Sequence, residues 1–309
     1  MSRSEEFTTG TVALIGAGRV ARGLGARLRE AGWRIGAVVA REIPSARGAV
    51  RAIRGGTACA GLTRRVLDAS VILLAVPDDA LAGVAAKLES VGGEELARKV
   101  VLHTSGALTA AVLEPVAKRG AWTGVIHPMQ TFGARARPRL ESVLFGIEGH
   151  PQALRVIRKM VSSLGGEAAR IDSRRKAQYH AAGTMAAAHV LTSMEAAVQL
   201  MLGAGLRRRE ATRALLRLTR QVLENQEMLG PRGAWTGPLS RGDLDTVRLH
   251  WEALGDYPTE FREAYAAMSR LAARILAEQP DALLARLDEI IGAAGKSAEA
   301  RAAAVRSGQ

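Results

Sequence analysis

The chain has 309 residues, of which 48% are hydrophobic, with six histidines, one cysteine and a formal net charge of +13. This length is sufficient for two domains, and the single cysteine, Cys59, excludes a disulfide framework and a cysteine-based metal cluster. The positive charge favours anionic ligands. Basic clusters at residues 135–139, 174–176 and 207–209 occur without a nucleic-acid-binding signature, so specific nucleic-acid binding is not expected.

The N-terminal segment MSRSEEFTTG has no apolar stretch typical of an export signal. No apolar run approaches the roughly 20 residues that a membrane span needs. We therefore expect a cytoplasmic protein that does not enter a membrane.

Residues 11–20, TVALIGAGRV, join a predicted strand to a glycine-rich turn and the start of a helix. The strand is apolar throughout, as a parallel strand buried on both faces requires. The two glycines permit a tight turn and a close approach of a pyrophosphate, whose charge the following helix N-terminus favours. We therefore expect a dinucleotide on Gly16, Ala17, Gly18, Arg19 and Val20.

The next predicted strand, Ile35–Val39, is followed by Ala40 and Arg41. A cofactor with a free ribose 2′-OH would favour an acidic residue at this position, whereas a guanidinium can donate two charge-assisted bonds to a 2′-phosphate. Arg41 and Ser45 are therefore candidate phosphate ligands, and the predicted cofactor is NADP(H) rather than NAD(H). The alternative is that Arg41 is only a solvated strand-end residue.

Apolar strands continue to alternate with helical stretches, which is typical of a doubly wound parallel sheet. Further strands are predicted at residues 71–76, 99–103, 124–127, 143–148 and 168–171, with a helix at 152–164. After residue 172 only helices are predicted, at 176–202, 209–227, 246–254, 258–276 and 280–291, before a tail that frays from Gly295. We expect an α/β Rossmann domain over residues 1–172 that binds NADP, and an all-α domain over residues 173–309.

The helix predicted over residues 176–202 is rich in small side chains, among them Ala182, Ala186 and Ala197. Such residues let another helix approach closely. A homodimer through the helical domain is therefore one interpretation, and burial within a single protomer fits the sequence equally well.

Ligands of an open parallel sheet bind beyond the carboxyl ends of its strands. Three such ends are polar here: Val76-Pro77-Asp78, His103-Thr104-Ser105, and His127 before PMQTF. Pro77 stops a strand where the cofactor passes, so Val76, Pro77 and Asp78 are candidate cofactor-binding residues, and Asp78 can also cap the next helix. Hydride transfer to a carbonyl needs a proton donor, for which histidine is suited. We therefore expect His127 and Ser105 to be catalytic, although a strand-end histidine can also bond only to backbone groups.

Two further groups lie in the helical half. Lys176, His180 and Thr184 share one face of a helix, which makes His180 a second candidate proton donor. The loop AWTGPLSRGD contains Arg241, which can clamp a substrate carboxylate, and Asp243. A plain turn between helices with a surface Arg–Asp pair is the alternative.

The motifs GAGRV, VPDD, HTSGAL, HPMQTF, YHAA and TGPLSRGD, in this order over roughly Val12 to Tyr265, resemble the bacterial Rossmann-like proteins with a C-terminal helical domain of unknown function. That family is similar in architecture to deazaflavin-dependent NADP reductases, pyrroline-carboxylate reductases and 6-phosphogluconate dehydrogenases. It is commonly described as NADP oxidoreductases. A local similarity to prephenate dehydrogenases implies that His127 transfers a proton and that Ser105 orients it.

The expected function is an NADP(H)-dependent oxidoreductase that acts on a small anionic carbonyl or imine compound, for example a 2-oxo acid such as ketopantoate. Members of the resembled family often carry Ser-Asn where this chain has Ala187-Ala188. This departure leaves a second interpretation open, namely an NADP(H)-binding sensor or partner protein without turnover.

Overall fold

In a computed structural model of the chain, residues 10–133 and 138–292 are described. They fall into two compact units that divide between His189 and Val190, and each unit is described by itself. The domain boundary predicted at residue 172 precedes this division. The predicted tail from Gly295, with Arg135 and Arg137 of one basic cluster, lies outside the described residues.

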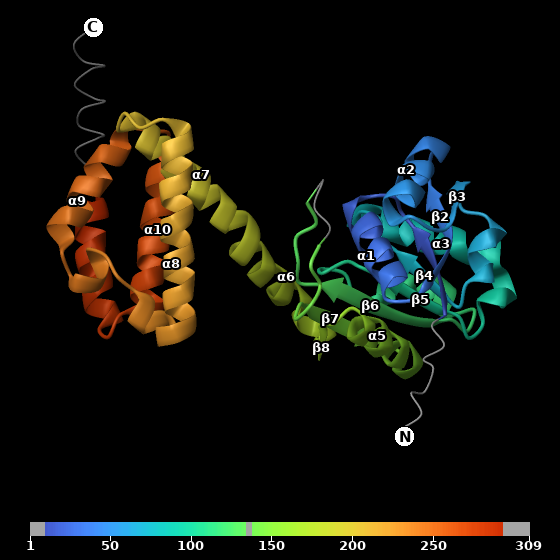
Figure 1. Ribbon diagram of the computed structural model, residues 1–309. Helices are drawn as coiled ribbons and strands as arrows, with labels where there is room; N and C mark the ends of the chain where they lie inside the picture. Colours follow the sequence, from blue (N-terminus) through green and yellow to red (C-terminus); the bar gives the residue numbers. More distant parts are fainter. Residues whose placement is uncertain (1–9, 134–137, 293–309) are drawn as a thin grey trace, which may run out of the picture. The chain divides into compact units, whose positions relative to one another are not determined.

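The first unit is built on an eight-stranded sheet in the order β3-β2-β1-β4-β5-β6-β7-β8 (Figure 1). The strands are β1 (Thr11–Ile15), β2 (Arg34–Ala40), β3 (Thr57–Ala60), β4 (Val71–Leu74), β5 (Val100–His103), β6 (Trp122–Pro128), β7 (Leu144–Gly149) and β8 (Glu167–Arg170). The helices are α1 (Arg19–Glu30), α2 (Ile43–Ile53), α3 (Asp78–Gly92), α4 (Glu114–Ala117), α5 (Pro151–Ser163) and α6 (Lys176–Thr184). This arrangement confirms the α/β Rossmann fold.

Both faces of the sheet are covered, and the central strands β1, β4 and β5 are apolar except at Thr11 and His103. Val12 and Leu14 of β1 point into a core that α1, α2 and α5 complete. Ala13 and Ile15 point to the opposite face, into a core that α3 and α4 complete. A strand buried on both sides has a nearly continuous apolar sequence, and this pattern made β1 predictable.

Three features differ from the sequence expectation. The short edge strand β3, of sequence TACA, was not predicted, because its residues carry little apolar signal and only its pairing with β2 defines it. Strand β7 pairs with β6 in an antiparallel arrangement, whereas all pairings among β1 to β6 are parallel. The long helix predicted over residues 176–202 contains a π-helical turn at Met185–His189, where α6 ends and the next helix begins.

The second unit is helical, which confirms the predicted class of the C-terminal half. It contains α7 (Val190–Gly203), α8 (Arg208–Ala234), α9 (Leu244–Ala253), α10 (Thr259–Leu276) and a further helix over residues 280–292. Helix α8 is interrupted at Gly230, whose φ of 72° breaks the helix just before Pro231. Residues of α9, α10 and the last helix form a small core around Val247, Trp251 and Leu287.

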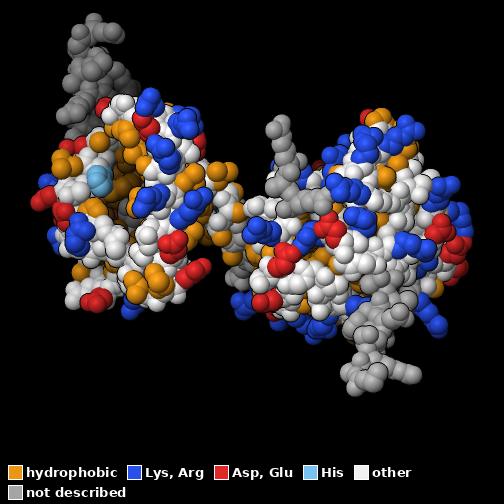
Figure 2. Space-filling model, in the orientation of Figure 1, with side chains coloured by type: hydrophobic (Ala, Val, Ile, Leu, Met, Phe, Trp, Pro, Cys, Tyr) orange, Lys and Arg blue, Asp and Glu red, His pale blue; other side chains and the backbone are white. Residues whose placement is uncertain are grey.

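Helices α8 and α10 leave many large apolar side chains exposed in this unit. They are Leu216, Leu218, Val222, Leu223, Met228 and Leu229 on α8, with Met268, Leu271 and Ile275 on α10. Apolar side chains also line a hollow in the helical unit in Figure 2.

The helical segment Ser173–Gly203 contains an 18-residue window with a mean hydropathy of 1.3, only 6% of which is buried, so by length and composition it could cross a membrane. Length and composition alone are weak evidence for a span, and the expectation of a protein outside membranes stays a prediction.

Candidate functional site

The turn between β1 and α1 requires glycine at one position and is open at another. Gly16 has a φ of +124°, and a Cβ on it would lie 2.2 Å from the carbonyl oxygen of Ala75. A Cβ on Gly18 would meet no atom within 4 Å. Gly18 is also the N-cap residue of α1, and because it has no side chain, no side-chain group caps the first N–H groups of the helix. The backbone there is free for an anion to approach, as a phosphate-binding turn requires.

The remaining predicted cofactor residues surround this turn in the same unit. Ala17 and Val20 pack against the core, and Arg19 is exposed at the start of α1. Arg41 and Ser45 are both exposed, after the end of β2. Glu42, between them, is the N-cap residue of α2.

His103 is buried completely at the end of β5, and its ring holds the following loop. Its Nδ1 accepts the backbone N–H of Ser105 at 3.1 Å, so the hydrogen lies on Nε2, which donates to the carbonyl of Thr109 at 3.1 Å. Burial is the main cause that lowers the pKa of His103 to about 4. This histidine therefore bonds to backbone groups, as the alternative interpretation proposed for a strand-end histidine.

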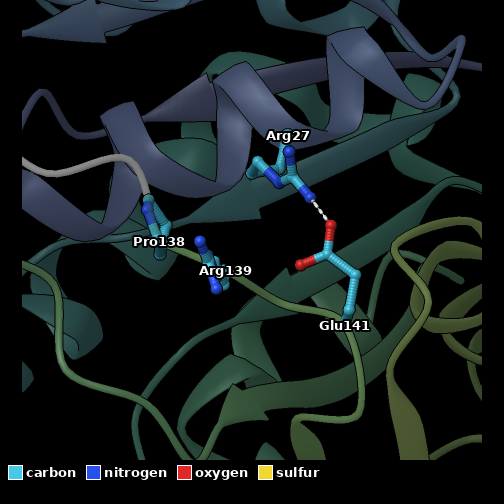
Figure 3. Close-up of a pocket in the computed structure, with 4 residues that line it drawn as sticks. All are labelled: Arg27, Pro138, Arg139 and Glu141. Atoms are coloured by element: carbon cyan, nitrogen blue, oxygen red, sulfur yellow. Dashed lines mark hydrogen bonds and ion pairs between the residues drawn. The ribbon is translucent and has the colours of Figure 1, made fainter.

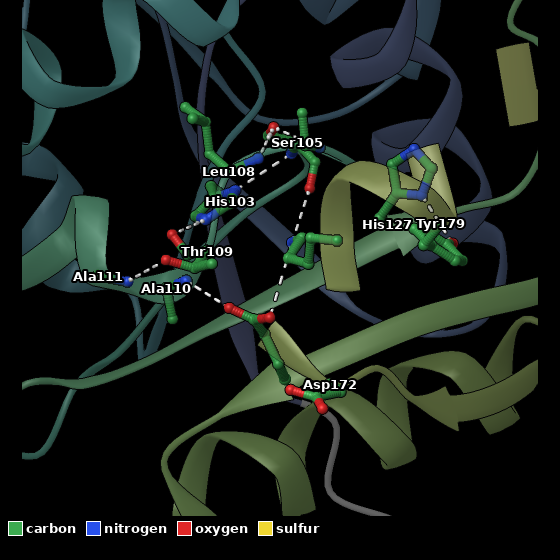
Figure 4. A network of polar contacts seen from close by, with 12 residues as sticks. His103, Ser105, Leu108, Thr109, Ala110, Ala111, His127, Asp172 and Tyr179 are labelled. Atoms are coloured by element: carbon green, nitrogen blue, oxygen red, sulfur yellow. Dashed lines mark hydrogen bonds and ion pairs between the residues drawn. The ribbon is translucent and has the colours of Figure 1, made fainter. Parts of the chain in front are cut away.

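The hydrogen-bond partners of the Ser105 hydroxyl differ from His127, the partner that the sequence predicted. Its Oγ donates to Asp78 at 2.8 Å and accepts the backbone N–H of Ala107. It also accepts the backbone N–H of Leu108 (Figure 4). The hydroxyl is thereby occupied by groups other than His127, and a role of Ser105 in orienting His127 stays a prediction. Asp78 is the first residue of α3, whose N-cap is Pro77, so Asp78 binds Ser105 instead of capping the helix.

The partner of His127 is Tyr179, which comes from α6. The Nδ1 of His127 and the phenolic oxygen of Tyr179 are 2.9 Å apart (Figure 4), and the ring of His180 lies 6.2 Å from that of His127. Gly106 leaves room for these rings, because a Cβ on it would lie 2.7 Å from both His127 Nε2 and His180 Cδ2. The structure thus brings the two predicted histidines together and adds Tyr179, which the sequence analysis did not select.

The surroundings of His127 favour its neutral form. Its pKa is lowered to about 4, first by burial and then by the electrostatic effects of His180 and Lys176. At neutral pH the imidazole is therefore uncharged, with one nitrogen that donates and one that accepts a hydrogen bond. Burial raises the pKa of Tyr179, so its phenol stays protonated.

A buried ion pair beside this site was also missed by the sequence analysis. Lys176 begins α6 and donates to the carbonyl of Ser105 at 3.3 Å, and its Nζ lies 3.9 Å from Oε2 of Glu148 in β7. The other carboxylate oxygen of Glu148 accepts the N–H of Ala110 at 2.6 Å. In the sequence, only the spacing of Lys176 from His180 indicated a role for Lys176. No sequence pattern indicated that Glu148 is its partner.

Arg241 and Asp243 lie in the second unit. Arg241 is exposed, and Asp243 caps α9: its Oδ1 accepts the backbone N–H of Thr246, and its Oδ2 accepts the Thr246 hydroxyl at 2.8 Å. These bonds, with a smaller effect of Arg241, lower the pKa of Asp243. Asp243 therefore has a local structural role, and the proposed contact of Arg241 with a substrate stays a prediction.

A cavity of about 470 Å³ lies away from all of these residues. It is lined by Arg27, Pro138, Arg139 and Glu141, and an ion pair joins Arg27 to Glu141 across it (Figure 3). None of the predicted site residues lines this cavity.

Comparisons with protein families and solved structures agree with the two-part architecture. Residues 6–128 match the Rossmann-like domain family, and residues 143–272 match the domain of unknown function DUF2520. The chain therefore carries one segment similar to the Rossmann-like domain family and a second similar to DUF2520. A search of curated proteins found no match.

Several solved structures share the fold at low sequence identity. A Bacteroides fragilis protein, provisionally described as an NADP oxidoreductase, is 24% identical, with a TM-score of 0.73 over 85% of this chain and 97% of that one. A Thermotoga maritima protein is 23% identical, with a TM-score of 0.63 over 84% and 96%. The reductive aminase of Aspergillus terreus, in complex with NADPH and ethyl-5-oxohexanoate, is 16% identical, with a TM-score of 0.65 over 86% and 94%. At these identities the likeness establishes the fold alone.

Proposed function

We propose that this protein is an NADP(H)-dependent oxidoreductase. The observation that carries the proposal is the placement of two features at one edge of the sheet. The open Gly16–Gly18 turn follows β1, and the neutral His127 stands near the end of β6; both strands belong to the parallel part of the sheet. Nicotinamide cofactors and their substrates occupy this edge in doubly wound folds. The protein provisionally described as an NADP oxidoreductase and the NADPH-bound aminase among the similar structures support the same cofactor.

The residues of the turn fit a dinucleotide. Gly18 leaves the backbone accessible, and α1 has no acidic residue in its first turn to repel a phosphate. Arg41, with Ser45 and Arg19, would hold a 2′-phosphate, which favours NADP(H). When bound, the nicotinamide would supply or accept a hydride.

His127 would serve the proton side of the reaction. If Tyr179 donates its phenolic hydrogen to Nδ1, the imidazole carries its own hydrogen on Nε2, the nitrogen next to Gly106. His127 would donate that hydrogen to the oxygen or nitrogen of the substrate during reduction while its Nδ1 takes up the phenolic hydrogen of Tyr179, so that the ring stays neutral. Solvent would then reprotonate Tyr179, and the same transfers would run in reverse during oxidation. His180 is the second candidate for this step.

For the substrate we propose a small anionic carbonyl or imine compound, of which a 2-oxo acid such as ketopantoate is one example. The net charge of +13 favours an anion. Arg241 would bind its carboxylate. The change Arg241→Lys keeps the charge but loses the planar fork, so it should raise KM with little effect on kcat.

A second candidate function is an NADP(H)-binding sensor without turnover. Ala187 and Ala188, which replace the Ser-Asn of the resembled family, lie in the π-helical turn Met185–His189. A π-helical turn often marks a functional position, so two alanines there are compatible with lost chemistry.

Calorimetry with NADPH, NADP⁺, NADH and NAD⁺ tests the cofactor, and NADPH oxidation against a panel of 2-oxo acids and cyclic imines tests the reaction. Binding with turnover supports the oxidoreductase, whereas binding without turnover across the panel supports the sensor. Absence of binding to all four dinucleotides would overturn both.

A further inference from the structure

The ammonium of Lys176 is buried in the first unit beside the residues that position His127. Lys176 is 3% exposed and Glu148 is 7% exposed. Oε2 of Glu148 has no hydrogen-bond donor within reach, and Lys176 Nζ is 3.9 Å away. The pair is therefore close enough for strong electrostatic attraction but too far apart for a direct hydrogen bond.

The same peptide unit lies against Lys176 and His127. Lys176 donates to the carbonyl oxygen of Ser105, and the next residue, Gly106, places its α-carbon beside His127 Nε2. Because a peptide unit is planar and its dimensions are fixed, Nζ and Nε2 are separated by no more than about 10 Å. At this distance in a protein interior, a unit charge changes a pKa by about one unit.

We propose that the buried Lys176–Glu148 pair controls the protonation of His127: the ammonium keeps the imidazole neutral, and the carboxylate limits that effect. Lys176 and Glu148 are positioning residues in this scheme, since they act on His127 without touching a substrate. Only the expected effect on the pH–rate profile rests on the proposed function; the effect on the protonation of His127 does not.

Other titratable groups near His127 also affect its pKa. Asp78 of α3 raises the pKa of His127, whereas His180 of α6 and His103 of β5 lower it. Beyond Glu148, Arg170 and Asp172 line a cavity of about 630 Å³. These groups are present in every variant of the pair, and the pKa of His103, which Lys176 also lowers, should rise with that of His127 in Lys176→Met.

The test is an NMR titration of the His127 ring in the full chain, with the signal assigned by its loss in His127→Gln. Lys176→Met removes the charge with little change in shape and should raise the pKa of His127 by about one unit. Glu148→Gln leaves the ammonium uncompensated and should lower that pKa or leave it unchanged. The double variant lacks both charges of the pair and should also raise that pKa, but by less than Lys176→Met, because the carboxylate that favours the charged imidazole is gone as well.

Opposite shifts distinguish control by charge from loss of structure. If the variants merely loosened the site, His127 would become solvated and its pKa would rise in all three. That result, or an unchanged pKa in the double variant, would overturn the proposal.

The wild-type protein gives a measurement that does not depend on the folding of any variant. Loss of the Lys176 proton at alkaline pH should cause a second, smaller step in the His127 chemical shift, and its absence would contradict the proposal. In an active enzyme, the acidic limb of the pH–rate profile should shift with the NMR value. If the NMR shifts appear but no substrate is turned over, the proposed function fails while the control of His127 stands.

Discussion

The phenolic oxygen of Tyr179 lies 2.9 Å from Nδ1 of His127, which joins helix α6 to the carboxyl end of β6. This contact fixes the orientation of the imidazole and leaves Nε2 facing Gly106. A histidine held in this way has one defined nitrogen available for chemistry, which a strand-end position by itself does not provide.

Replacement of His127 by Asn should lower turnover by about 100-fold, because the proton-transfer group is lost, and should change NADPH affinity little. Tyr179→Phe removes the bond to Nδ1, with the bond from the Gly146 backbone, but keeps the imidazole, so it should lower kcat less. Steady-state kinetics and NADPH titration measure both effects. His150→Asn is the matched control, since His150 caps α5 and asparagine is a good cap. Unchanged turnover in both His127→Asn and His180→Asn would remove histidine catalysis.

The two glycines of the β1–α1 turn should respond differently to alanine. Gly16→Ala should destabilise the fold, because the new methyl group would meet the Ala75 carbonyl in a backbone conformation that strains any L-residue. Gly18→Ala should leave the melting temperature nearly unchanged, since its φ is −74° and the space is open, but should weaken NADPH binding. Thermal denaturation and calorimetry separate the two effects; tight NADPH binding by Gly18→Ala would argue against a phosphate at this turn.

Arg41 should determine the preference for NADPH over NADH. Arg41→Asp should weaken NADPH binding by about 2 kcal/mol or more, through a lost charge-assisted bond and new repulsion. Arg34→Asp is the matched control, because Arg34 starts the same strand, β2, at its opposite end and makes the same change in net charge. Equal affinities of the wild-type protein for NADPH and NADH would show that the prediction is wrong.

Acidification should destabilise the first unit through His103. Its pKa is about 4 in the fold and 6.5 as the unperturbed value, so between these pH values the unfolded chain binds more protons. The stabilisation is complete above pH 6.5 and is lost as the pH falls towards 4, by about 3 kcal/mol for His103, and His127, whose pKa is lowered in the same way, adds to this loss. Urea denaturation at several pH values measures this loss. A free energy of unfolding that is constant over this range would contradict it.

The exposed leucines of α8 lead us to predict a homodimer through the helical unit. Leu218 and Leu229 are each 62% exposed, and burial of such side chains against a second copy would be favourable. Analytical ultracentrifugation should show a dimer that Leu218→Glu and Leu229→Glu dissociate, whereas Arg217→Glu on the same helix should not. A monomeric wild-type protein, or one recovered only with lipid, would contradict this prediction.

The sequence determined the elements whose signal is local. The apolar run before Gly16, the glycines of the turn and the helical periodicity after residue 172 each depend on neighbouring residues, so the Rossmann class and the helical half were predictable. The positions of His127 and His180 were also accessible, because a strand end and a helical spacing can be read from a single chain.

Tertiary structure decided the partners of these residues. Tyr179 bonds to His127, Ser105 bonds to Asp78, and Lys176 faces Glu148 across segments that are far apart in the sequence. Such contacts depend on which strand lies next to which and on how deeply each side chain is buried. Burial also lowers the pKa of His127 to about 4 and makes it neutral, and no residue type or spacing in the chain carries that information.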